Sequence, residues 1–343
     1  MTDVPHLRFP EFSGEWENTE LQYIAPNICS GKDKPTSNGT VALYGSTGII
    51  GMTRLASYNE EIVLVARVGA NAGQLQITTI PCGVTDNTLI INAKEWNRYI
   101  YYYLQHYNLN RLVFGSGQPL ITGSMLKKLK IIYGEESERN KIVNLLCLLD
   151  ERIATQNKII DKLQSLIKGI AQNITCSNKP NVHISECLEC SSSTLQESDV
   201  CENGAYPVYG ANGVVGYLNY YNTLSEAIYI IKDGSGVGTV SYVTGKCSPT
   251  GTLNILQVKD GYSLRYLYYL LKVFNFEPYK TGMAIPHIYF KDYGKAKIFC
   301  PQYSEQLKYA TLLFTIDDKL STEQEILKSL NLEKQYLLRQ MFI

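Results

Sequence analysis

The chain reads SERNKIVNLLCLLDERI from Ser137 to Ile153 and SEQLKYATLLFTIDDKL from Ser304 to Leu320, 167 residues further on. Both stretches space their apolar residues by four and three in alternation, which is the heptad pattern of a helix that pairs with another helix. Each pattern continues for nearly 40 residues, so it predicts a helix of about 55–60 Å at 1.5 Å per residue. These two helices decide the architecture.

Each predicted helix carries a narrow apolar seam with one polar position, Gln156 in the first helix and Glu323 in the second. The first seam comprises Ile142, Leu146, Leu149, Ile153, Ile160, Leu163, Ile167, Ile170 and Ile174. The second comprises Tyr309, Leu313, Ile316, Leu320, Leu327, Leu330, Leu337 and Met341, and it weakens at Lys334. A seam this narrow requires a partner helix. The obvious partner is the other copy in the same chain.

The helices are the last part of a longer internal repeat. Further segments recur in the same order, at offsets of 165 to 167: Tyr44–Gly51 as Tyr209–Gly216, Ile62–Gly73 as Ala227–Gly238, Arg98–Leu104 as Arg265–Leu271, and Gly115–Ile121 as Gly282–Ile288. The chain is therefore two copies of one unit of about 165 residues.

Each copy begins with short β-branched runs bounded by glycine, which predict strands. Residues 95–107 predict one helix within the first copy, with a core-facing stripe of aromatic side chains. The predicted fold class is α+β, with two pseudo-symmetric domains of mixed sheet and short helices joined by the two long helices. We expect domains at 1–135 and 176–303 and long helices at 136–175 and 304–343.

Composition excludes several classes of protein. Of the 343 residues, 45% are hydrophobic and 19% are charged, which argues against global disorder. Lys plus Arg and Asp plus Glu both total 32, so the chain shows no basic excess of its own. No apolar run is long enough to span a membrane. The N-terminal stretch lacks a secretion signal and the nine cysteines follow no disulfide framework, so we expect a cytoplasmic protein.

Two weaker motifs allow other chemistry. The glycine-rich stretches Gly69–Gly73 and Gly234–Gly238 suggest phosphate binding, but strand-like sequence follows them where a phosphate loop needs a helix, so we interpret them as turns. Cys187 and Cys190 form a single CxxC, with His183, Cys176 and Cys201 nearby; a zinc site needs two tight pairs, so we expect free thiols and no metal. The usual catalytic motifs do not occur, which makes binding a better expectation than catalysis.

Polar and basic residues beside the predicted turns are the remaining candidates for chemistry. Arg, Asn and Gln can read base edges, whereas Lys and Ser usually hold phosphate. The candidate DNA-binding residues are Lys32, Lys34, Arg54, Arg67, Asn71, Gln74, Gln118, Asn212, Lys232, Ser235, Lys280 and His287. Arg67 and Lys232 occupy the same repeat position, whereas His287 corresponds to Leu120.

Specific motifs give the chain a resemblance to the specificity subunits of type I restriction–modification systems. They are LRFPEFSGEWE (Leu7 to Glu17), the stretch around Cys29 to Lys32, YGSTGIIG, ARVGANAG and GSGQPLI, together with the helix sequence from Ser137 to Ile170. The resemblance implies two target recognition domains, each reading one half of a split sequence in double-stranded DNA. It implies an antiparallel coiled coil that sets the spacing and docks two methyltransferase subunits.

The resemblance also implies that the chain itself is non-catalytic. S-adenosylmethionine, ATP and Mg²⁺ would then belong to the methyltransferase and restriction subunits. By charge, residues 1–135 hold 11 basic and 11 acidic side chains and residues 176–303 hold 10 of each, so we expect the isolated chain to bind DNA weakly. The alternatives are a coiled-coil adaptor that binds protein and no DNA, and a nucleotide-dependent enzyme that uses the glycine loops.

Overall fold

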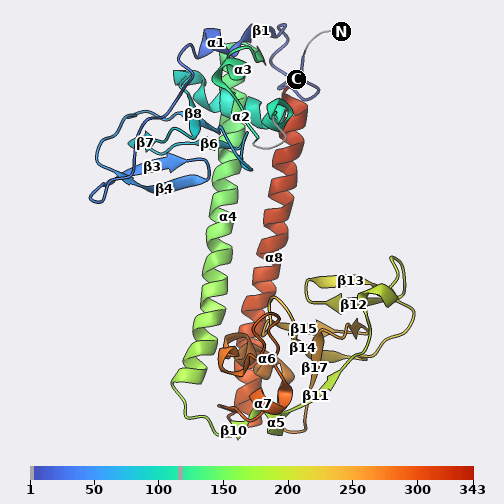
Figure 1. Cartoon of the computed structure of the whole chain (residues 1–343). Helices are drawn as coiled ribbons and strands as arrows, with labels where there is room; N and C mark the ends of the chain where they lie inside the picture. The colour runs from blue at the N-terminus through green and yellow to red at the C-terminus, as the bar shows by residue number, and fades with distance from the viewer. Residues whose placement is uncertain (1–3, 115–118) are drawn as a thin grey trace. The chain divides into compact units, whose positions relative to one another are not determined.

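The computed structural model describes residues 4–114 and 119–343 (Figure 1). The chain divides into two compact units. Unit 1 comprises Met1–Gln156 with Ile326–Ile343, and unit 2 comprises Asn157–Glu325. Each unit therefore contains one half of each long helix.

The two long helices are α4, Glu136–Cys176, with 41 residues, and α8, Tyr303–Met341, with 39 residues. Their lengths confirm the prediction from the heptad pattern. Among the described apolar seam residues and Gln156, the buried ones are Ile142, Leu146, Leu149, Gln156, Ile160, Ile167, Ile174, Leu313, Leu320, Leu330 and Met341. Those of intermediate exposure are Ile153, Leu163, Ile170, Tyr309, Ile316, Leu327 and Leu337.

The helices pair in an antiparallel sense within each unit. In unit 1, Ile142 and Leu146 at the start of α4 share a core with Leu338 and Met341 at the end of α8. In unit 2, side chains from the end of α4 and the first half of α8 line one cavity of 450 Å³. The start of one helix thus lies beside the end of the other, as two heptad seams in one chain require.

Unit 1 builds three small sheets before α4. Its strands are β1 Glu17–Glu20, β2 Cys29–Ser30, β3 Val41–Gly45, β4 Gly48–Thr53, β5 Val63–Ala66, β6 Leu75–Ile77, β7 Cys82–Val84, β8 Thr88–Ile91 and β9 Lys130–Tyr133. Its short helices are α1 Leu21–Ile24, α2 Asn97–Tyr107 and α3 Gly123–Lys127, with 3₁₀ turns at Lys94–Trp96 and Leu109–Leu112. The helix predicted for residues 95–107 is therefore present.

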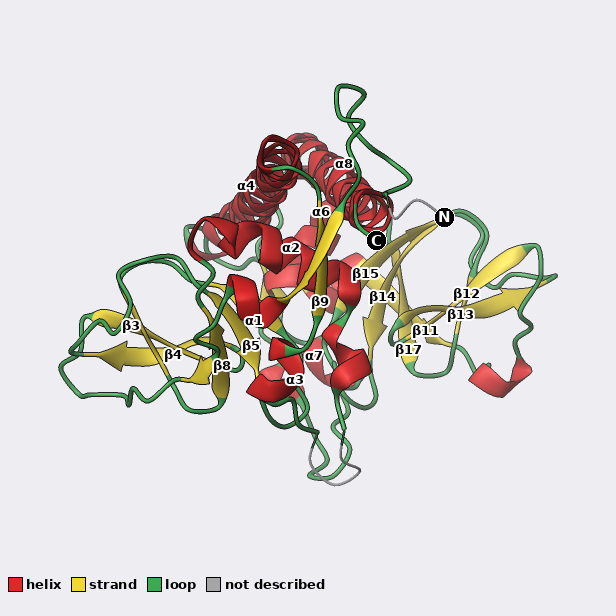
Figure 2. Ribbon diagram, turned by 90° about the horizontal axis from the view of Figure 1, so that it is seen from above, coloured by secondary structure: helices red, strands yellow, loops and turns green. Residues whose placement is uncertain are grey.

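The sheets of unit 1 have the orders β2-β8-β5-β6, β4-β3-β7 and β1-β9. All pairs are antiparallel except β3 with β7. Figure 2 shows the β3–β4 hairpin extending to one side of β5 and β8. All four residues of β5 are buried. Val63 and Val65 face the helical core, while Leu64, together with Ile62 just before the strand, faces a second core beneath the β3 sheet.

Unit 2 repeats the same plan. Its strands are β10 Val182–His183, β11 Leu188–Ser192, β12 Tyr206–Gly210, β13 Gly213–Leu218, β14 Glu226–Ile231, β15 Val240–Thr244, β16 Ser248–Pro249, β17 Leu253–Val258 and β18 Lys297–Ile298. Its short helices are α5 Ile184–Cys187, α6 Leu264–Val273 and α7 Phe290–Tyr293, with 3₁₀ turns at Glu197–Asp199 and Glu277–Tyr279. The sheet orders β11-β17-β14-β15, β13-β12-β16 and β10-β18 match those of unit 1 strand for strand.

Repeated tyrosines hold the short helices in place. Tyr99 on α2 donates a hydrogen bond to the carbonyl of Ile132 at 2.8 Å, and Tyr266 on α6 donates to Phe299 at 2.9 Å. Both rings are fully buried, and burial raises the pKa of both phenols. These two repeated tyrosines therefore belong to the buried parts of their units.

Candidate nucleic-acid interface

A glycine turn closes the strand pair β5–β6 in unit 1 and β14–β15 in unit 2. Gly73 donates its N–H to Ala66 at 2.9 Å, and Gly238 donates to Ile231 at the same distance. The φ angles are +78° at Gly69 and +92° at Gly73, with +88° and +92° at the equivalent glycines of unit 2. These angles favour glycine, so the recurrence of glycine at each position follows from the shape of the turn. Strands, and no helices, follow both turns, as the sequence predicts.

A second loop, which we call the tip hairpin, is attached to each glycine turn. In unit 2 it spans residues 281–287, closed by two hydrogen bonds between Thr281 and His287 of 2.9 and 2.8 Å. In unit 1 the corresponding bonds join Phe114 and Leu120. Gly234 donates to Pro286 at 3.0 Å, and Gly69 donates to Pro119 at 3.0 Å. Turn and hairpin therefore form one structure in each unit, named here the loop pair.

The unit 1 loop pair brings three of the predicted residues together. Asn71 and Gln74 are exposed on the glycine turn. Arg67 lies at its base, partly exposed, and donates from Nη1 to Ser30 Oγ at 3.3 Å. Gln118, also a candidate DNA-binding residue, lies outside the described residues.

The neighbouring loop holds the other predicted cations of unit 1. Asp33 anchors this loop, since its carboxylate accepts from the Val84 N–H at 2.8 Å and from Ser57 Oγ at 2.6 Å. Lys32 and Lys34 flank Asp33 and are exposed. The chain then runs beside the end of β4, which Arg54 follows, also exposed. Because Ser30 binds Arg67 and lies two residues before Lys32, this loop adjoins the loop pair, whereas Arg54 follows the end of β4 that is remote from the hairpin turn.

The turn of the β3–β4 hairpin extends this region. Ser46 Oγ donates to the Asn87 carbonyl at 3.2 Å, and the same carbonyl accepts the Arg67 N–H at 2.9 Å. The equivalent turn in unit 2 is that of β12–β13, where Asn212 is exposed. Asn212 therefore occupies the matching position in its own unit.

The unit 2 loop pair contains the remaining predicted residues. Ser235 is exposed on the glycine turn, and Lys232 lies at its base with Nζ 3.8 Å from the Asp233 carboxylate. His287 closes the tip hairpin, with Nδ1 2.8 Å from Asp233 Oδ1. Lys280 already pairs with Glu277 at 2.6 Å, so its charge is partly neutralised within the chain.

Several residues of this surface were not predicted from the sequence. Ser30 contacts Arg67, and Asp233 contacts His287. The ring of Tyr289 stacks on that of His287, with centroids 6.5 Å apart. Met283 and Ile285 are exposed at the tip of the hairpin. From the sequence alone, apolar side chains such as these are expected in the core. Only the structure of the hairpin shows that they are exposed.

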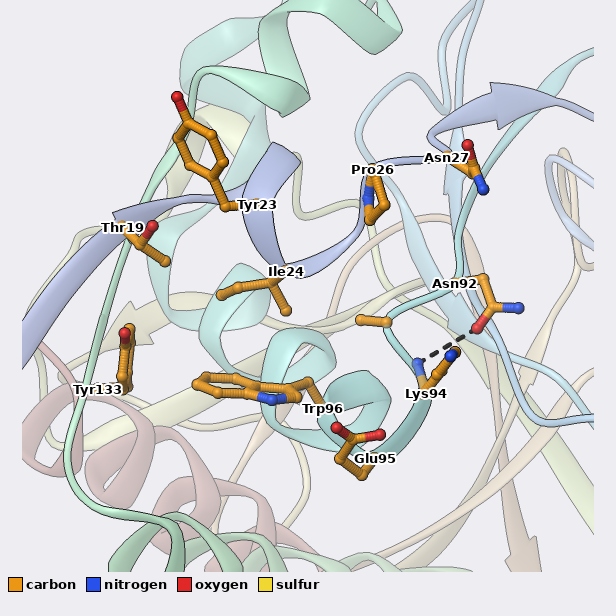
Figure 3. A pocket seen from close by; sticks show the side chains of 11 residues that line it. Thr19, Tyr23, Ile24, Pro26, Asn27, Asn92, Lys94, Glu95, Trp96 and Tyr133 are labelled. Atoms are coloured by element: carbon orange, nitrogen blue, oxygen red, sulfur yellow. Dashed lines mark hydrogen bonds between the residues drawn. The ribbon is translucent and has the colours of Figure 1, made fainter.

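An aromatic pocket of 650 Å³ in unit 1 lies elsewhere (Figure 3). Trp96, Tyr133 and Tyr23 line it, and the Arg139 guanidinium lies 3.5 Å from the centroid of the Trp96 ring. The pocket is at the N-terminal end of α2, whereas the glycine turn packs beyond its C-terminal end. In unit 2 the residue equivalent to Trp96 is Ser263, so the pocket is not a repeated feature.

The cysteines considered for zinc do not converge. A hydrogen bond with Cys300 lowers the pKa of the Cys187 thiol, whereas burial raises the pKa of the Cys190 thiol to about 11. A zinc ligand must be a thiolate, and at Cys190 the raised pKa disfavours that form. Among the residues that the structure describes, no three His, Cys, Asp or Glu side chains are grouped to hold a metal.

Comparison with known proteins places this geometry in a family. Residues 6–165 and 181–332 match the family described as Type I restriction modification DNA specificity domain. A type I specificity subunit of Mycoplasma genitalium is 25% identical over 305 residues, which cover 80% of this chain and 79% of the relative. The specificity subunit of the type I restriction enzyme EcoprrI from Escherichia coli is 24% identical over 125 residues, covering 36% of this chain and 31% of that protein.

Solved structures share the fold. The crystal structure of a type I restriction–modification S subunit from M. genitalium aligns with a TM-score of 0.76 at 19% identity, covering 99% of both chains. A chain from a structural study of complex assembly in the type I system aligns with a TM-score of 0.53 at 15% identity, covering 98% of this chain and 99% of that one.

Fold and repeated loop pairs thus define a non-catalytic specificity component with two target recognition domains. The chain belongs to the type I restriction–modification DNA specificity family, as the specificity subunit of such a complex.

Proposed function

We propose that each loop pair, with the cations around it, reads one half of a bipartite target in double-stranded DNA. The observation that carries this proposal is the duplication of the loop pair, with the same backbone hydrogen bonds, in one chain. Two similar reading surfaces in one chain suit a target made of two half-sites. We assign recognition to residues 1–135 and 176–303 and spacing to residues 136–175 and 304–343.

The chemistry around the loop pairs suits DNA. Arg67, Asn71 and Gln74 carry side chains that can bind base edges bidentately, while Lys32 and Lys34 suit phosphate. Asn212, Lys232 and Ser235 occupy the corresponding surface of unit 2. Glycine turns let the backbone approach a ligand closely.

The coiled coil is proposed to act as a spacer and as a docking site. Both α4 and α8 run continuously through the boundary between the units, which gives the spacer a helical core. Exposed apolar side chains lie along these helices, and they suit contact with two methyltransferase subunits. They are Leu148, Leu166, Leu312, Phe314 and Leu332.

Catalysis is assigned to the partner subunits. The methyltransferase subunits would bind S-adenosylmethionine, and the restriction subunits would use ATP and Mg²⁺ for translocation and cleavage. The balanced charge of both recognition domains indicates that these partners supply much of the phosphate contact. A cytoplasmic location follows from this role, and none of the described helices is long and apolar enough to cross a membrane.

Arg67→Ala and Lys232→Ala test the proposal in the complex assembled with the methyltransferase subunit. If each cation holds phosphate, each substitution should lower DNA affinity for all sequences and reduce the salt slope by about one unit. If each reads a base, the loss should be about 1–3 kcal/mol at one position of one half-site, the first for Arg67 and the second for Lys232. Binding titrations at several salt concentrations measure both effects.

The matched control is Lys162→Ala, an exposed lysine on α4 that belongs to neither loop pair. It should leave affinity and salt slope unchanged. Unchanged affinity, salt slope and sequence preference in both loop variants would contradict the proposal. A wild-type complex that assembles but binds no DNA would favour the adaptor alternative.

A further inference from the structure

His287 and Asp233 form a side-chain pair at the base of the unit 2 loop pair. The imidazole Nδ1 lies 2.8 Å from Asp233 Oδ1, and the other carboxylate oxygen lies 3.8 Å from Lys232 Nζ. About one third of each side chain remains exposed, 34% for His287 and 35% for Asp233. The pair therefore lies where a ligand of this surface can reach the ring.

Surrounding contacts fix the orientation of the imidazole. The backbone of His287 is held by two hydrogen bonds to Thr281, and the Tyr289 ring stacks nearly parallel to the imidazole at an angle of 26°. Asp233 is itself held by the bridge between strands that it forms with His287. In the part of the chain that the structure describes, Nε2 makes no hydrogen bond, so this nitrogen is available to a ligand.

Unit 1 offers an internal comparison. The residues equivalent to Asp233 and His287 are Val68 and Leu120, and they form the same bridge between the glycine turn and the tip hairpin. The backbone is therefore built without the polar pair. A carboxylate and an imidazole are not needed to hold the loop pair together, which leaves a role in recognition.

We propose that His287 is a specificity-determining residue of the second recognition domain and that Asp233 is its positioning residue. This proposal rests on the proposed DNA-reading function. Asp233 accepts a hydrogen bond from Nδ1–H, and in the neutral tautomer that this bond selects, Nε2 is a hydrogen-bond acceptor. An acceptor in the major groove selects a base with an exocyclic amino group, adenine through N6 or cytosine through N4. The first domain has Val68 and Leu120 at the equivalent positions, and neither side chain can form a hydrogen bond to a base.

The experiment maps modified bases in a host that carries the chain and its methyltransferase subunit, by long-read sequencing of genomic DNA. His287→Ala should relax the preference for adenine or cytosine at one position of the second half-site by about tenfold or more. The first half-site should stay the same, and it serves as the control for folding and assembly within the same map. Lys162→Ala, the exposed control on α4 that belongs to neither loop pair, should leave both half-sites unchanged.

Asp233→Asn tests the positioning role separately. An asparagine amide can donate to Nδ1, which moves the ring proton to Nε2 and turns the reader into a donor. The preference at the same position should then shift or be lost, because a donor can bind N7 of guanine or adenine, O6 of guanine and O4 of thymine alike. A shape-filling role alone would leave the base unchanged, because asparagine and aspartate have nearly the same volume.

Three results would overturn the inference. They are an unchanged second half-site in His287→Ala, an unchanged base in Asp233→Asn, and a change in both half-sites in either variant. Failure of the underlying function is distinguishable, because the wild-type complex would then modify no specific sequence before any variant is compared.

Discussion

At the scale of single residues, Glu138 explains why the opening motif of the chain matters. Its carboxylate is fully buried and accepts two hydrogen bonds from Arg8, at 2.6 and 2.8 Å, and one from Trp16 at 3.1 Å. The hydrogen bonds from Arg8 are bidentate, and they raise the pKa of the guanidinium. The motifs LRFPEFSGEWE and SERNKIV, far apart in the sequence, thus meet in one contact.

Arg8→Met should destabilise unit 1 strongly, because it leaves the Glu138 carboxylate buried without its cation. We expect a loss of about 3–5 kcal/mol in the free energy of unfolding, measured by chemical denaturation. The matched control is Lys141→Met, which removes the exposed pair of Lys141 with Glu11 and should cost about 0–1 kcal/mol. Equal losses of unfolding free energy in the two variants would contradict the claim that the buried pair stabilises unit 1 more than the exposed pair does.

Residue chemistry was only partly predictable from the sequence. The sequence shows the cations and amides beside the turns, and the structure places Asn71 and Gln74 at one glycine turn with Arg67 at its base. The partners of these side chains could not be predicted from the sequence. Ser30 meets Arg67, and Asp233 meets His287, through strand pairings that no local pattern encodes. The pair of Asp233 and His287 shows this most clearly.

At the scale of elements, the heptad pattern predicted α4 and α8 because a helical period is a local property of the sequence. Lys334 interrupts the apolar seam of α8, but its charge is paired by a residue on α4. Its ammonium lies 2.6 Å from Asp150 Oδ1, and 5.6 Å from the centroid of the Tyr102 ring. The partner could not be assigned from one helix alone, because it depends on the register of the pair.

The tyrosines of α2 and α6 link each recognition domain to its long helix. Tyr102 donates to Asp150 at 2.9 Å, and Tyr269 donates to Asp317 at 3.2 Å. The two contacts are related by the repeat offset of 167 residues. The stripe expected for residues 95–107 comprised Trp96, Tyr99, Ile100, Tyr103, Leu104 and Tyr107; it omitted Tyr102, which is also buried in the core of unit 1.

A heptad inserted into both helices, after Gln156 and after Glu323, tests the spacer role. Seven residues add roughly 10 Å of helix and keep the seam on nearly the same face. The gap between the half-sites should grow by about 3 bp while both half-sequences stay the same. A map of modified sites measures this, and an unchanged gap would contradict the spacer role.

At the scale of the whole molecule, duplication was the most informative signal in the sequence. Offsets of 165 to 167 predicted two units of the same plan, and the sheets of the two units match strand for strand. The division of each domain into three small sheets was not predictable. Contacts such as β1 with β9 join strands more than 100 residues apart, and their pairing is fixed by the tertiary core.

The central claim is that each domain reads one half of the target independently. Replacing Pro10 to Ile131 with the equivalent segment of a related specificity subunit tests it most directly. This segment includes the unit 1 loop pair but leaves Arg8, Glu138 and both long helices in place. A map of modified sites should show a new first half-sequence, with the second half and the gap unchanged. A change in both halves, or loss of modification in a complex that still assembles, would contradict the account.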